Sequence, residues 1–121
     1  MLMQLALIAD DNHLTLVALN GRITPDSFSH ESEPLASLLG PGAYHRRVLL
    51  DLTDADYINS SGVGWLLVCH KRFRDAGGRL VIHSIPRLIR SVLEVLKMDQ
   101  VFHLAGDLES ARQMASQGTV P

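Results

Sequence analysis

The residues best placed to do chemistry lie in one short segment, Asn59-Ser60-Ser61-Gly62-Val63-Gly64. The segment follows an apolar run, residues 48–52, and precedes a helical pattern that begins near Ser61. A helix N-terminus has unpaired N–H groups and a partial positive charge, so it favours anions. A serine hydroxyl at such a point can cap the helix, carry a phosphate or contact a partner.

The two serines and the two glycines support different interpretations. A serine N-cap is the ordinary one, and Ser61 is the serine that we assign to the cap. One cap does not need two serines, however, and glycine inside a helix costs about 1 kcal/mol relative to alanine. Gly62 and Gly64 are explained if something must approach the backbone closely. A phosphate on Ser60 would add roughly two negative charges to a contact surface.

Catalytic alternatives have less support. The Gly-x-Ser-x-Gly pattern of a nucleophile elbow is absent. None of the six histidines has the spacing of metal ligands, and the single cysteine, Cys69, is typical of a small core residue. Asp51, Asp54 and Asp56 could hold Mg²⁺ or orient a hydroxyl, although loop and cap roles are the default. We expect no catalytic residue, no metal and no cofactor.

The composition bounds the class of protein. The chain has 121 residues and a formal net charge of -2, which argues against a nucleic-acid partner. One cysteine excludes an intrachain disulfide and fits a reducing, cytoplasmic setting. No apolar segment approaches the ~20 residues that span a bilayer, and the apolar N-terminus lacks the basic residues of a signal peptide. We therefore expect a cytoplasmic protein that does not insert into a membrane.

Hydrophobic patterning predicts an α/β domain with a mixed β-sheet of about five strands covered by about four helices. The segment 24–39 is expected to begin at a Thr24 cap and to be split or distorted by Pro34. Asp107 is expected to cap the last helix. The expected strands are 2–8, 14–19, 47–52, 79–83 and 101–104. The other expected helices run from residue 60 or 61 to 76, from 86 to 97, and onward from Asp107.

Two stripes of residues run along the predicted helix 60–76. Gly62, Leu66, Cys69, Phe73 and Ala76 recur at helical spacing and are expected to face the core. The other stripe runs from Ser61 through Trp65 to Arg72. It could be a partner-binding face with Trp65 as its anchor, or the tryptophan could be buried as large aromatic residues usually are.

The chain resembles the STAS domain family, and more narrowly the bacterial anti-sigma factor antagonists. The resemblance rests on Gly21-Arg22-Ile23, on residues 48–53, on residues 58–64 and on residues 77–80, and it covers nearly the whole chain. It implies a single STAS domain over residues 1–121. Two positions depart from the family pattern: Asn59 stands in place of an aspartate, and Thr24 in place of another, with Asp26 two positions later.

The resemblance also implies a function. Such a protein has no catalytic activity, binds an anti-sigma factor that is also a serine kinase, and thereby releases a sigma factor. The kinase phosphorylates the first serine of the pair, here Ser60, which breaks the complex, and a phosphatase resets it. A monomer or weak homodimer is expected. The residues expected to bind the partner are Thr24, Asp26, Asn59, Ser60, Ser61, Gly62, Val63, Gly64 and Trp65.

Two other functions stay open. The same domain could be a docking subunit of a transporter, lipid-transport or sensory complex, in which the serine segment is a permanent contact without a phospho-switch. It could also be a small hydrolase that uses Ser60 or Ser61, although no histidine stands at the spacing of a catalytic base.

Overall fold

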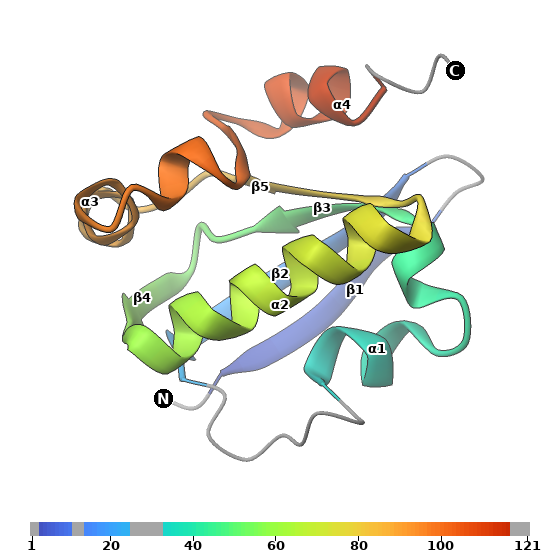
Figure 1. Ribbon diagram of the computed structural model, residues 1–121, viewed down its shortest axis with the longest axis horizontal. Helices are drawn as coiled ribbons and strands as arrows, with labels where there is room; N and C mark the ends of the chain where they lie inside the picture. Colours follow the sequence, from blue (N-terminus) through green and yellow to red (C-terminus); the bar gives the residue numbers. More distant parts are fainter. Residues whose placement is uncertain (1–2, 11–13, 25–32, 117–121) are drawn as a thin grey trace.

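Alternating short apolar runs and amphipathic segments form a mixed sheet with helices on both faces (Figure 1). The computed structural model describes residues 3–10, 14–24 and 33–116. The strands are β1 Gln4–Asp10, β2 Thr15–Ile23, β3 Arg47–Asp51, β4 Ala55–Ile58, β5 Arg79–His83 and β6 His103–Ala105. The helices are α1 Pro34–Leu39, α2 Ser60–Ala76, α3 Arg87–Val95 and α4 Leu108–Ser116, with 3₁₀ turns at Ala43–His45 and Met98–Gln100.

The sheet has the strand order β1-β2-β3-β5-β6, and β4 pairs with the far end of β2. The β1–β2 pair is antiparallel and the other pairs are parallel. A register shift between Leu7 and Ala9 places a bulge in β1, which is an edge strand. The expected mixed α/β sheet with four helices is confirmed in the described residues.

Two apolar layers hold this sheet. The face toward α1 and α2 carries the larger cluster, which includes Leu50, Leu66 and Phe73 and which Ile89 and Leu93 of α3 join. The opposite face, under α4, packs Leu49 and Val81 against small helical residues. Because β3 and β5 are covered on both faces, most of their side chains are buried, which is typical of Val- and Leu-rich runs.

Strand β4 was not predicted. Its four residues, Ala55-Asp56-Tyr57-Ile58, include a charged side chain and follow Asp54, a composition that favours a loop. Strand β2 extends beyond the residues that pair with β3, and β4 forms by pairing with this extension. Thr15 to Ala18 pair with β3, and the remaining end of β2, from Gly21 to Ile23, pairs with β4. This extra pairing brings the chain back to the sheet immediately before α2.

Pro34 was expected to split or distort a helix over residues 24–39, and of that segment the structure describes residue 24 and residues 33–39. This proline is the first residue of α1, and Glu33 is the N-cap. Proline suits that position because its missing N–H would have had no helical partner there. Leu35 and Leu39 are buried, as the pattern required. Pro25, Asp26 and Phe28 lie outside the described residues.

The predictions for the last two helices differ in outcome. The Oδ1 of Asp107 accepts a hydrogen bond from the Ser110 amide at 2.8 Å, so the predicted cap of α4 is confirmed. In α3, only Ile89 and Leu93 are buried. The helical pattern also predicts an apolar face that includes Leu88, Val95 and Leu96, and these side chains are 65%, 80% and 47% exposed. A short helix on a sheet buries one narrow stripe, and these side chains lie outside it.

Candidate functional site

The predicted serine segment lies where β4 ends and α2 begins. Asn59 has an extended backbone (φ -120°), and its Oδ1 accepts a hydrogen bond from the Gly62 amide at 2.9 Å. The Asn59 carbonyl accepts from the Val63 amide at 3.0 Å. Asn59 is therefore the N-cap, and the assignment of the cap to Ser61 was wrong. Asparagine is as good a cap as serine, and it stands one position before both serines.

Ser60 and Ser61 occupy the first two positions of α2, and both are exposed. Because the cap hydrogen bond comes from Asn59, neither hydroxyl is needed to begin the helix. Among hydrogen bonds between described residues, none joins either hydroxyl to a histidine or a carboxylate. The described geometry thus gives neither serine an activating base.

Gly62 is required by the approach of the chain's own backbone. A Cβ atom built on it would lie 2.1 Å from the carbonyl oxygen of Ile23 and 2.9 Å from Cγ1 of Ile58. Both neighbours come from the β2–β4 pair on which the helix rests. The expectation that a glycine here allows close approach is correct, but the approaching group is Ile23 and not a partner.

Gly64 differs from Gly62 in its surroundings. It is exposed, and nothing lies within 4 Å of a Cβ atom built on it, when helix backbone within four residues is left aside. The fold therefore does not demand glycine at this position. The lack of a side chain next to the exposed serines leaves a flat surface on the first turn of α2.

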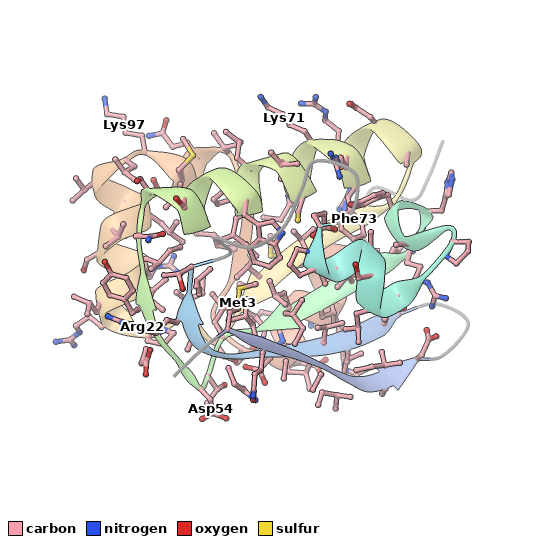
Figure 2. The ribbon with its side chains drawn as sticks, turned by 90° about the horizontal axis from the view of Figure 1, so that it is seen from below. Met3, Arg22, Asp54, Lys71, Phe73 and Lys97 are labelled. Atoms are coloured by element: carbon pink, nitrogen blue, oxygen red, sulfur yellow. The ribbon has the colours of Figure 1, made fainter. Side chains whose placement is uncertain are left out.

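We call the exposed residues Ser60, Ser61 and Gly64, with the neighbouring Tyr57 of β4, the serine end of the molecule. Tyr57 is 38% exposed, and the guanidinium carbon of Arg22 lies 4.7 Å from the centre of its ring. This cation–π contact gives the serine end a positive and aromatic border. Figure 2 shows Arg22 at the end of the molecule where β4 meets α2.

Trp65 does not belong to the serine end. Its side chain is 1% exposed, and its Nε1 donates a hydrogen bond to Oε2 of Glu33 at 2.7 Å. Of the two alternatives for Trp65, burial is confirmed and the role of partner anchor is contradicted. Val63 is also buried, at 7% exposure. Thr24 and Asn59 are half-buried.

Sequence reasoning missed Glu33, a fully buried carboxylate. It accepts hydrogen bonds from the Leu35 and Ala36 amides at 2.9 and 2.8 Å, and from the Tyr44 hydroxyl at 2.6 Å. Together with the Trp65 indole, these donors compensate the cost of burying a charge. Burial, and then the bond to Glu33, raise the pKa of Tyr44 to about 12. A glutamate before a proline signals a helix cap, but its distant donors have no sequence signature.

Cys69 lies beside the same carboxylate, with its Sγ 3.4 Å from Oε2 of Glu33. Burial first, and then the negative charge of Glu33, raise the pKa of this thiol well above its ordinary value. The thiol is therefore protonated and packed in the core, as expected of a structural cysteine.

The acidic residues before the serine end form a turn. Oδ1 of Asp51 accepts hydrogen bonds from the amide and the hydroxyl of Thr53 at 2.8 and 2.6 Å. Asp54 and Asp56 are exposed. Within the part of the chain that the structure describes, no group of three or more potential ligands is arranged to hold a metal ion. Nor does any helix there have the length and apolar character needed to cross a lipid bilayer.

The exposed apolar side chains of α3 lie at the same end of the molecule. Figure 1 shows α3 beside β4, the strand that leads into α2. Leu88 and Val95 are seven residues apart, which places them on one side of the helix, and Leu96 follows directly. The serine end thus has an apolar neighbour, which would be buried if a partner protein covered both.

The chain is similar to known proteins in sequence and in fold. A family model described as "Mlab, STAS domain" matches residues 6–109. A protein of Bordetella bronchiseptica, assigned as the anti-sigma factor antagonist BtrV, is 30% identical over 98 residues, which are 81% of this chain and 83% of that protein.

Two solved structures share the fold. One, from Thermotoga maritima and assigned as an anti-sigma factor antagonist, has a TM-score of 0.68 at 14% identity and covers 95% of each chain. The other, the anti-sigma factor antagonist SpoIIAA in its unphosphorylated form, has a TM-score of 0.60 at 16% identity and covers 97% of this chain and 99% of that one.

Proposed function

The chain belongs to the STAS domain family, and we propose that it is an anti-sigma factor antagonist whose serine end binds an anti-sigma factor with serine kinase activity. Binding would sequester that partner and release a sigma factor. The protein would act in the cytoplasm, as a monomer or weak homodimer and without catalysis of its own. The relative from Bordetella bronchiseptica supports this proposal, since that protein is assigned as an anti-sigma factor antagonist.

One observation carries the proposal: Ser60 is exposed at the first position of α2, and the fold does not use its hydroxyl. Asn59 caps the helix and Gly62 seats it on β2, so the local structure is complete without either serine. A kinase can therefore modify Ser60 without first unfolding the helix.

A phosphate on Ser60 would change the contact surface more than the fold. It would bring about -1.5 to -2 charges to the N-terminus of α2, where the helix dipole tolerates them. The same charge and bulk would oppose a partner that had packed closely against the flat surface at Gly64. Phosphorylation of Ser60 would thus break the complex, and a serine phosphatase would restore binding.

Asn59 is compatible with this switch. The cap needs only a side-chain oxygen, which asparagine supplies as well as the aspartate common in the family. Asn59 differs from that aspartate because it lacks a negative charge next to Ser60. If that charge serves the kinase rather than the cap, Asn59→Asp would speed phosphorylation and leave the helix in place.

The exposed apolar side chains of α3 favour a second candidate function, a docking subunit of a transporter, lipid-transport or sensory complex. Leu88 and Val95 are among the most exposed large apolar side chains in the described residues. Permanent interfaces are more apolar than transient ones. In this role the serine end and α3 would form one constant contact without a phospho-switch.

The experiment that separates the two functions uses Ser60→Ala and Ser61→Ala as a matched pair. Each variant is incubated with ATP and a histidine-kinase-like ATPase from the same genome, and intact mass is measured. The proposal expects one phosphate on the wild type and on Ser61→Ala, and none on Ser60→Ala. Phosphate that persists after Ser60→Ala would refute the assignment of Ser60.

Binding is then measured by calorimetry with Ser60→Asp, which places a carboxylate where the phosphate would be. We expect at least a tenfold loss of affinity for the kinase. Wild-type and Ser60→Asp proteins that bind the same partner equally, without phosphorylation in either case, would support the docking subunit instead.

A further inference from the structure

A second candidate site lies at the opposite end of α2 from the serine end. This helix has 17 residues, so about 25 Å of helix separate its two ends. At its C-terminal end the surface encloses a hollow of about 370 Å³, within the range of roughly 300–1,000 Å³ typical of small-molecule sites. The lining residues are Arg47, His70, Arg74, Gly77, Gly78, Arg79, Leu80 and His103.

The lining is strongly basic. Three of these residues are arginines, two are histidines and none is acidic. The one carboxylate paired with a lining arginine in the described ion pairs is Asp75, 3.2 Å from Arg74, and both of those side chains are more than 60% exposed. Arg79 Nη1 donates to the carbonyl oxygen of Met114 at 2.8 Å, which fixes its guanidinium between β5 and α4.

The strand arginines are the unusual part of this arrangement. Arg47 and Arg79 are register partners at the first positions of β3 and β5, so two like charges stand side by side on adjacent parallel strands. Both are half-buried, and like charges on directly neighbouring positions destabilise a sheet. A bound anion would be attracted by both side chains.

Arg74 has a structural role, as Arg79 does through its bond to the Met114 carbonyl oxygen near the end of α4. A cation in the last turn of a helix is favoured by the negative end of the helix dipole. That dipole amounts to about half a negative charge, which would repel an anion. Arg47 and Arg79 add two full positive charges from other elements, so the net field in the hollow still favours a negative ligand.

The two histidines add donors to the same wall. The rings of His70 and His103 have their centres 5.4 Å apart. Burial first, and then the charges of His103, Arg74 and Lys71, lower the pKa of His70. Burial and then Arg79 lower the pKa of His103. Near neutral pH both imidazoles are therefore neutral, and each has one N–H to donate.

We infer that this hollow is a binding site for a phosphate dianion, either free or as the monoester of a small molecule. Guanidinium groups match the oxygen geometry of a phosphate, and three arginines line the hollow. The hollow exceeds the roughly 30 Å³ that one water occupies more than tenfold, so it leaves room for an esterified group. The site is independent of the serine end.

The test is a titration of the whole chain followed by backbone amide NMR near neutral pH. Inorganic phosphate is one probe and glycerol 3-phosphate another, each at an ionic strength held constant with sodium chloride. We expect saturable shifts of the Gly77, Gly78 and Leu80 amides and none at the serine end. Tighter binding of the ester would identify a phosphorylated small molecule as the ligand, and equal binding would identify phosphate itself.

Three arginine variants decide the assignment. Arg47→Gln should weaken the binding of phosphate about tenfold, since one charge-assisted hydrogen bond is lost. Arg74→Gln removes a mostly exposed side chain, so it should weaken binding and leave folding intact. Arg90→Gln, in an exposed pair with Glu94 on α3, is the control and should change nothing.

The inference would be overturned by shifts that rise linearly without saturation, by equal shifts with chloride alone, or by affinities that neither Arg47→Gln nor Arg74→Gln reduces.

Discussion

Gly62 and Gly64 stand two residues apart in the first turn of α2, and replacing each with alanine should have opposite effects on stability. Alanine is about 1 kcal/mol better than glycine inside a helix, and both residues have helical backbone, so both variants gain this amount. At Gly64 nothing opposes the gain, because the new Cβ meets no atom within 4 Å. We expect Gly64→Ala to be about 1 kcal/mol more stable than the wild type.

Gly62→Ala must overcome a clash with the sheet. Its Cβ would lie 2.1 Å from the Ile23 carbonyl oxygen, whereas ordinary contact begins at 3.4 Å, so the start of α2 would have to move by about 1.3 Å. The neighbour is backbone in a fully buried strand segment and cannot rotate away. Overpacking of this kind costs about 3 kcal/mol, which leaves a net loss of about 2 kcal/mol.

The two variants should therefore differ by about 3 kcal/mol in the free energy of unfolding. For a chain of 121 residues this corresponds to melting temperatures about 12 °C apart. Urea denaturation followed by circular dichroism gives the free energies, and calorimetry gives the melting temperatures. Equal stabilities of the two variants would refute the claim that Gly62 is required by packing on Ile23.

Partner binding should depend on Gly64 as well as on Gly62, for different reasons. Gly64→Ala leaves the fold intact and adds a methyl group to the serine end, so it should weaken binding to the partner kinase without loss of stability. Gly62→Ala should weaken binding through the displacement of Ser60. A stable Gly64→Ala variant with unchanged affinity would place the contact surface elsewhere.

Three further predictions concern the cap, the buried carboxylate and the histidines. Asn59→Ala should cost about 1 kcal/mol in urea denaturation, and Ser61→Ala less than about 0.5 kcal/mol; the reverse order would return the cap to the serine. Glu33→Gln should cost about 3 kcal/mol, because an amide nitrogen then faces donors that need an acceptor, and fluorescence of the single tryptophan, Trp65, should report the change. Stability should fall as the pH drops below about 6.5, where the unfolded chain takes up protons that the folded chain resists, and it should be constant from there up to about pH 7.5, below the pH at which a free thiol ionises. A denaturation series between about pH 7.5 and pH 5.5 tests this, and a rise on acidification would contradict it. The histidines responsible have a pKa lowered first by burial: His70, His83 and His103.

Much of the fold was predictable because its elements carry strong local patterns. The strand Arg79–His83 was predicted with the bounds that the structure has, and the helix Ser60–Ala76 with its start placed at Ser60 or Ser61. Strand β4 could not be predicted, because its pairing depends on how far β2 extends beyond β3. That is a property of the assembled sheet and leaves no pattern in four residues.

The candidate site was predictable in position but not in detail. The exposed serines at the start of α2 were anticipated, since the strand, the hydroxyls and the helix are adjacent in sequence. Burial of Trp65 was one of two alternatives, and the pattern could not decide between them because the indole's partner, Glu33, is 32 residues away in the chain. Helical spacing places a side chain on a stripe, but it cannot tell which stripe a distant element will cover.

The bulge in β1 has a consequence for colloidal behaviour. An edge strand offers unpaired backbone groups to other molecules, and β1 also exposes Leu7 and Ile8, at 46% and 62%. A second copy could extend the sheet only along a regular ladder, and the register shift between Leu7 and Ala9 interrupts that ladder in mid-strand. The bulge therefore shortens the stretch on which another chain could nucleate a fibril, and its repair by deletion of Ile8 would be expected to make the protein prone to aggregate.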